Sequence, residues 1–77
     1  MLVSLGEMRV GQAGVIRQVL GGRGFVRRLE VLGIRPGKSV AKTSAHMWAG
    51  PVLVEVDGRT IALGSGMARR VLVEVPS

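Results

Sequence analysis

One stretch of the chain has the periodicity of a helix and lies between segments that have the periodicity of strands. Its apolar side chains recur at i, i+1, i+4 and i+7, the spacing of one helix face; they are Phe25, Val26, Leu29 and Leu32. The opposite face holds Arg27, Arg28 and Glu30. Gly33 stands where a left-handed residue commonly ends a helix. The pattern therefore predicts one short helix that packs its apolar face on a sheet.

The segments on either side of this helix predict five short strands. Alternating or β-branched apolar residues occupy the ranges 14–20, 39–44, 52–56, 59–63 and 70–75. Residues 4–11 are expected to be an irregular lead-in anchored by Leu5 and Met8. Ser65 is expected to cap a single helical turn before the last strand. Strands this short, joined by tight turns, favour closure into a small barrel.

Two turns have residues suited to one backbone geometry. Arg35 to Lys38 predicts a type II turn, because Pro36 fixes φ at the second position and Gly37 accepts a positive φ at the third. Asp57 and Gly58 predict a type I′ hairpin between two strands. Both turns support the expected order of elements.

Composition sets limits on the class of protein. The chain has 77 residues, which suits one domain over residues 1–77 with a single modest core. It has no cysteine, so disulfides and thiolate metal sites are excluded. The first residues lack the pattern of a signal peptide, and the longest apolar run, residues 47–54, is too short to span a membrane. We expect a soluble protein that does not itself cross a membrane.

A net charge of +6 is the strongest compositional hint of function. Such a charge suggests an acidic partner surface, a nucleic acid or an anionic lipid. The same charge is also ordinary for the solubility of a small domain. Charge alone therefore leaves the partner open.

The sequence predicts no catalytic residue, metal site or cofactor. Residues 33–39 look like a phosphate-binding loop, but only three residues separate the two glycines and a strand, not a helix, is expected to follow. His46 is the single histidine, and the five carboxylates lack ligand spacing. No serine, threonine or lysine has an oriented base nearby. These features favour a binding module over an enzyme.

Protein contact is the remaining function class with candidate residues. Small barrels that bind single-stranded nucleic acid place aromatic residues on strand faces, whereas Phe25 and Trp48 are expected on the helix and in a loop. Tryptophan, methionine and arginine are enriched at protein interfaces, so the candidate partner contacts are Arg27, Arg28, Met47 and Trp48. Trp48 equally suits a lid over one open end of the barrel. Self-association through an edge strand, giving a homodimer, also stays open.

The order of motifs resembles the FeoA family of ferrous-iron transport accessory proteins. The resemblance covers nearly the whole chain, and its most specific part is Arg-Leu-x-x-Leu-Gly-Ile-x-Pro-Gly, from Arg28 to Gly37. Further matching residues are Gly50-Pro51, Asp57-Gly58, Ile61-Ala62-Leu63 and Met67-Ala68. The structural positions of the motif are Leu29, Leu32, Gly33, Pro36, Gly37, Asp57 and Gly58.

The resemblance implies a five-stranded, SH3-like barrel with one short helix between its first and second strands. It implies a cytoplasmic protein that assists and regulates FeoB, the GTP-dependent Fe(II) transporter of the membrane, and that carries no catalytic residues. The family is associated with transition-metal ions, although no ligand set can be carried over to this chain. The same module looks like the SH3-like domain of metal-dependent repressors. We expect no helix-turn-helix segment before it, which favours the free-standing form.

Overall fold

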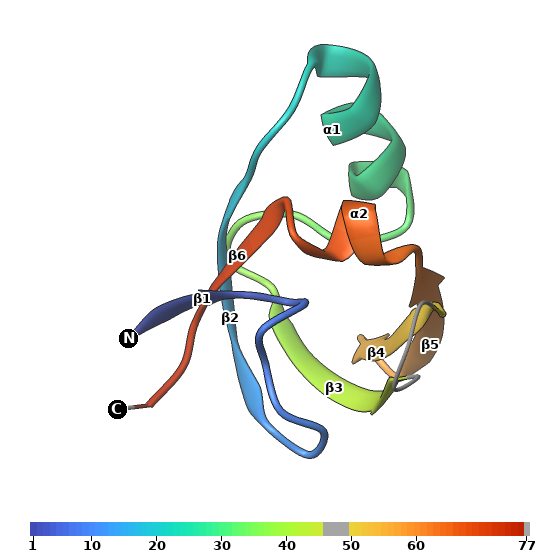
Figure 1. Cartoon of the computed structure of the whole chain (residues 1–77). Helices are drawn as coiled ribbons and strands as arrows, with labels where there is room; N and C mark the ends of the chain where they lie inside the picture. The colour runs from blue at the N-terminus through green and yellow to red at the C-terminus, as the bar shows by residue number, and fades with distance from the viewer. Residues whose placement is uncertain (46–49, 77) are drawn as a thin grey trace.

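The computed structural model describes residues 1–45 and 50–76 and contains six strands and two helices over them (Figure 1). In chain order the elements are β1 (Leu2–Ser4), β2 (Ala13–Val19), α1 (Arg23–Val31), β3 (Ser39–Ala45), β4 (Val52–Val56), β5 (Arg59–Leu63), α2 (Ser65–Ala68) and β6 (Val71–Glu74). The mainly β class predicted from the sequence is confirmed. The expected number of five strands is wrong by one.

All six strands belong to one antiparallel sheet in the order β1-β6-β2-β3-β4-β5. The pairing register shifts between Ile16 and Gln18 in β2, and again between Lys42 and Ser44 in β3. Such bulges bend a strand and increase its twist. Figure 1 shows that β2 and β3 are strongly curved, so that the sheet bends round on itself.

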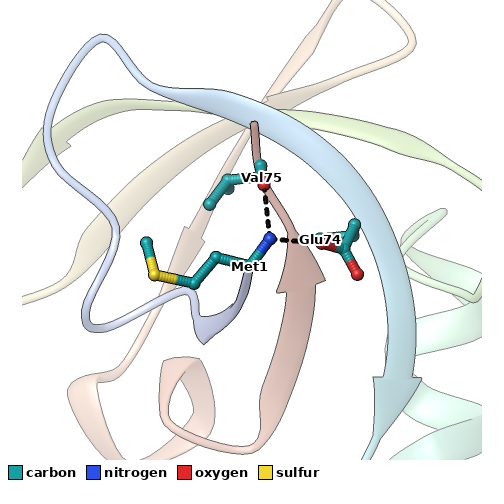
Figure 2. Close-up of polar contacts among 3 residues, drawn as sticks. All are labelled: Met1, Glu74 and Val75. Atoms are coloured by element: carbon teal, nitrogen blue, oxygen red, sulfur yellow. Dashed lines mark hydrogen bonds and ion pairs between the residues drawn. The ribbon is translucent and has the colours of Figure 1, made fainter. Parts of the chain in front are cut away.

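The additional strand is β1, which the sequence predicted only as the start of a lead-in. Leu2, Val3 and Ser4 pair with Glu74, Val73 and Leu72 of β6. Three residues are too few for an alternating pattern to appear, so the strand is defined by its distant partner. The terminal amine of Met1 extends this pairing with bonds to the Glu74 carboxylate and to the Val75 carbonyl oxygen, the latter at 2.9 Å (Figure 2).

A capping box closes the turn after β1. The Ser4 amide donates to the Glu7 Oε1 atom at 2.9 Å, and the Glu7 amide donates to the Ser4 Oγ atom at 3.1 Å. This reciprocal pair is the signature of Ser-x-x-Glu, a signal that the sequence analysis missed. The turn directs Leu5 and Met8 into the core, as predicted for these two anchors.

Helix α1 begins two residues earlier than its apolar pattern predicted and ends in a Schellman motif. The Ile34 amide donates to the Leu29 carbonyl, and the Gly33 amide donates to the Glu30 carbonyl, both at 2.9 Å. Gly33 has a φ of +94°, which only glycine adopts without strain. The predicted helix stop at Gly33 is therefore confirmed. Leu29 and Ile34, at 0% exposure, join this end of the helix to the core.

Leu32 differs from its prediction as a member of the apolar face. It is the C-cap residue of α1 and remains 36% exposed. Its carbonyl oxygen accepts a hydrogen bond from Arg59 Nη2 at 3.1 Å, so a side chain of β5 completes the end of the helix. The apolar periodicity extended the helix one residue too far, because α1 ends at Val31 and Leu32 only caps it.

Both predicted turns are confirmed. Gly37 has a φ of +94°, and the Lys38 amide donates to the Arg35 carbonyl at 3.2 Å, as a type II turn with Pro36 requires. Asp57 and Gly58 have φ values of +53° and +77°, as a type I′ turn requires. The predicted Ser65 cap is wrong, because Gly64 is the N-cap of α2 and no side chain bonds there.

One charged side chain is buried among residues 1–45 and 50–76. Lys42 is 4% exposed, and its Nζ atom donates to the carbonyl oxygens of Met8 at 2.6 Å and Gly6 at 3.1 Å. Burial lowers the pKa of Lys42 from its usual value. Lys42 therefore ties β3 to the turn that follows β1.

Candidate docking surface

The outward side of α1 is a basic surface, because the helix carries three arginines and one glutamate. Leu29 faces the core, so Arg27 lies on the opposite side of the helix. Arg23 and Val31 lie one turn before and one turn after Arg27 on the same ridge. Val31 is 77% exposed, the largest exposed fraction among the exposed large apolar side chains of the described residues. An apolar side chain thus stands in line with two arginines.

Two shallow depressions run along this ridge and share two of their lining residues. The larger, of about 480 Å³, is lined by Gly21, Arg23, Gly24, Val26, Arg27 and Glu30. The smaller, of about 290 Å³, is lined by Arg27, Glu30, Val31 and Arg35. We call the combined surface the α1 groove. It extends from the glycine-rich loop before the helix to the proline turn after it.

The arginines of the α1 groove have no carboxylate partner within the described residues. The two ion pairs found there, Met1–Glu74 and Lys38–Asp57, include no arginine. Glu30 lies in the groove but forms no hydrogen bond or ion pair with Arg23 or Arg27 among residues 1–45 and 50–76. The first turn of α1 also has no acidic side chain to offset the positive end of the helix dipole. The groove therefore carries net positive charge, with three arginines against one glutamate in its lining.

The structure separates the two arginines that the sequence grouped as contact residues. Arg27 lines both depressions, whereas Arg28 is exposed on the flank of the helix and lines neither. The other two predicted contacts, Met47 and Trp48, lie outside the described residues. Of the four, Arg27 is the residue that the geometry connects with a hollow surface.

Val31 and Arg35 were not predicted as members of this surface. Val31 continues the one-turn spacing that starts at Arg23 and Arg27, and this spacing was the available signal for it. Val31 did not fit the apolar face, and Arg35 was considered only as part of a turn. Val31 lies near Arg27 because both are in α1, whereas the place of Arg35 depends on the course of the chain after α1 ends.

A third hollow, of about 200 Å³, has two carboxylates in its lining, those of Glu55 and Asp57. It is lined by Ala13, Ser39, Val40, Ala41, Glu55, Asp57 and Gly58. Asp57 accepts a hydrogen bond from Lys38 Nζ at 2.8 Å. That bond, the charge of Lys38 and the smaller contributions of Arg59 and Arg35 lower the pKa of Asp57. This carboxylate already has a partner and is not available as a free acid or ligand.

The described part of the chain offers neither a cluster of metal ligands nor a membrane-spanning helix. No three His, Cys, Asp or Glu side chains gather there in a way that would hold a metal ion. None of the helices in residues 1–45 and 50–76 has the length and apolar character needed to cross a membrane.

Comparison with solved structures finds close relatives of this fold. A crystal structure of a FeoA, described as an iron uptake regulatory protein, is 35% identical over 96% of this chain and 97% of its own, with a TM-score of 0.90. FeoA of Stenotrophomonas maltophilia is 29% identical over 94% of this chain and 89% of its own, with a TM-score of 0.80. That protein was crystallised with zinc and is described as an SH3 domain protein and a candidate activating factor of bacterial ferrous iron transport. The SH3-like fold predicted from the sequence is therefore confirmed.

The fold also occurs as part of larger proteins. A manganese-dependent transcriptional repressor is 22% identical, with a TM-score of 0.88; the match covers 97% of this chain but 42% of the repressor. At this identity the likeness concerns the fold alone. A comparison with functionally curated sequences finds no match.

The family model of the FeoA domain matches residues 3–75, which is nearly the whole chain, and includes both ends of the α1 groove. Together with the 35% identity to a solved FeoA, this match means that the chain belongs to the FeoA family.

Proposed function

We propose that this protein is a non-enzymatic, cytoplasmic accessory factor of ferrous iron transport that docks on a FeoB-type membrane transporter and regulates it. Membership of the FeoA family supports the connection with iron transport. The description of the S. maltophilia relative as a candidate activating factor supports a regulatory role. The transporter's cytoplasmic GTP-binding region and the adjacent face of its membrane domain are the expected docking sites.

The observation that carries this proposal is the basic ridge of α1, which ends in the exposed apolar side chain of Val31. Arginine is enriched at protein interfaces, and charged residues around an apolar contact steer association and select the partner. Arg23 and Arg27 lie on this ridge and form no ion pair with another described residue, and Val31 supplies apolar area that the fold itself leaves in water. Such a surface suits contact with another protein.

Co-purification with the cognate transporter tests the proposal. The tagged protein is expected to retain the detergent-solubilised transporter after nuclease treatment, and the Arg27→Glu/Arg28→Glu variant is expected to lose it. Because both arginines are exposed, the double variant should melt within a few degrees of wild type, which circular dichroism verifies. Failure of the wild type to retain the transporter would contradict the proposal.

Nucleic-acid binding is the second candidate, and the net charge of +6 is the observation that favours it. Binding of this kind would weaken steeply with salt, because each neutralised phosphate releases a counterion. If the protein bound DNA or RNA with a steep salt dependence and did not retain the transporter, the second candidate would replace the first.

A further inference from the structure

We infer that the α1 groove binds an acidic helical segment of a partner protein, with carboxylates that pair with Arg23, Arg27 and Arg35 and an apolar side chain that covers Val31. This inference rests on the proposed function, because it specifies what kind of partner surface docks and where. It also separates Arg27 from Arg28, which the proposed function treats together.

The spacing of the positive groups matches that of a second helix. Arg23, Arg27 and Val31 follow one another at intervals of four residues, which are about 6 Å along the axis of α1. A helix laid alongside presents its own side chains at the same interval, so carboxylates at i and i+4 can meet successive guanidinium groups. Arginine suits this role, because its planar group holds a carboxylate with two parallel hydrogen bonds.

The groove also offers an apolar contact between its charged positions. Val31 lines the smaller depression together with Arg27 and Arg35 and is 77% exposed. Partner helices that dock in grooves are commonly anchored by apolar side chains, and the surrounding charges set specificity. An apolar residue of the partner over Val31 would remove both side chains from water and fix the register of the charge pairs.

Glu30 makes the groove selective for partners that have no carboxylate at the position facing it. It lines both depressions and carries the only negative charge among their lining residues. A partner carboxylate beside Glu30 would be repelled, whereas a neutral or basic side chain would fit. The complement of the groove is therefore a patterned acidic segment and not a uniformly negative chain.

The same pattern argues against two other acidic partners. A flat anionic membrane surface would meet the Glu30 carboxylate together with the arginines. Single-stranded nucleic acid binds through aromatic stacking, but Phe25, the aromatic side chain of α1, packs against the core and under Arg70, whose guanidinium carbon lies 5.1 Å from the ring centre. A protein segment fits the observations better than either.

Fluorescence anisotropy with a defined probe tests the inference. The probe is a fluorescein-labelled, helix-forming peptide of about 15 residues with glutamates at i, i+4 and i+12, a leucine at i+8 and a glutamine facing Glu30. We expect the intact protein to bind it, Arg27→Glu to weaken binding about tenfold or more, and Arg28→Glu to change it less than about threefold. The two variants make the same charge change on the same helix, so nonspecific electrostatics would affect them equally.

A variant at Glu30 is expected to strengthen binding of a peptide with a glutamate at the facing position, whereas the Arg27 variant weakens binding. Glu30→Gln removes the repulsive charge and is expected to tighten binding of a probe with a glutamate at the facing position, while leaving the matched glutamine probe within about twofold. Equal losses in Arg27→Glu and Arg28→Glu would overturn the inference. So would stronger binding to phosphatidylglycerol vesicles or to a single-stranded oligonucleotide than to the acidic peptide.

The inference and the proposed function fail in different ways. Retention of the transporter that survives Arg27→Glu but is lost in Arg28→Glu would overturn the inference and leave the proposed function standing. Binding of the acidic peptide through Arg27 by a protein that never retains the transporter would support the inference and overturn the proposed function.

Discussion

Replacing Gly14 with alanine tests whether the sheet closes as tightly as the structure requires. A Cβ atom at this position would lie 2.3 Å from the Glu74 carbonyl oxygen and 2.7 Å and 2.9 Å from Cγ1 atoms of Val73 and Val75. Ordinary contact begins near 3.4 Å, so β2 and β6 would have to separate by about 1 Å at this point. The neighbouring pairs Val15↔Glu74 and Ile16↔Val73 hold these strands together. The substitution therefore disturbs both a backbone ladder and the core.

Overpacking of a well-packed site costs about 1–3 kcal/mol, and the rigid backbone atom in the contact places Gly14→Ala at the upper end, near 3 kcal/mol. A domain of this size loses about 4–8 °C in Tm for each kcal/mol, which gives a decrease of about 12–24 °C. Thermal unfolding followed by circular dichroism, with urea unfolding as a second measure, gives both quantities.

The matched control is Gly24→Ala in the first turn of α1. An added Cβ there meets no atom within 4 Å, and alanine stabilises a helix by about 0.5–1 kcal/mol relative to glycine. We therefore expect Gly14→Ala to lower the Tm and Gly24→Ala to raise it, although both replace glycine with alanine. A Tm for Gly14→Ala within about 2 °C of wild type would refute the close approach of β2 and β6.

Three further predictions concern single side chains. Leu29→Ala is expected to lower the free energy of unfolding by about 2–5 kcal/mol, and Val31→Ala by less than about 0.5 kcal/mol, because Leu29 is fully buried and Val31 is in water; equal effects in urea unfolding would contradict the orientation of α1. The hydrogen bond from Lys38 lowers the pKa of Asp57 in the folded chain from its ordinary value of 3.8. The stability from this contact is therefore present above pH 3.8 and is lost as the pH falls through the folded pKa. The stability difference between wild type and Lys38→Met should vanish in acid. Burial lowers the pKa of Lys42 in the folded chain from its ordinary value of 10.5. The contribution of Lys42 to stability therefore rises with pH between the folded pKa and pH 10.5. Lys42→Met should remove this slope, and its persistence in the variant would argue against a buried ammonium group.

Local chemistry in the sequence was sufficient to predict α1 and the turns. Gly33, Gly37 and the pair Asp57-Gly58 all adopt positive φ, and each was predicted from its own neighbours. In contrast, β1 could not be predicted, because its three residues become a strand only by pairing with β6 at the other end of the chain. Elements defined by a distant partner leave little trace in a local pattern.

The candidate site was predictable in part, for a similar reason. Arg27 was recognised because helical periodicity places it opposite the apolar face. The difference between Arg27 and Arg28 was not visible, because the hollow beside Arg27 is completed by Gly21 and Arg35, which lie outside the helix. Periodicity describes the faces of one helix, whereas a groove depends on the chain that enters and leaves it. Met47 and Trp48 stay predictions.

The most direct test of the account is an amide chemical-shift map of the isotope-labelled protein titrated with the soluble GTP-binding region of the cognate transporter. The account predicts that the shifted amides gather between residues 21 and 35, around the α1 groove, and that the amides of the β5 edge, residues 59–63, stay in place. It also predicts that Arg27→Glu removes these shifts and Arg28→Glu retains them. Saturable shifts centred on β5, or shifts around α1 that Arg27→Glu leaves unchanged, would contradict it.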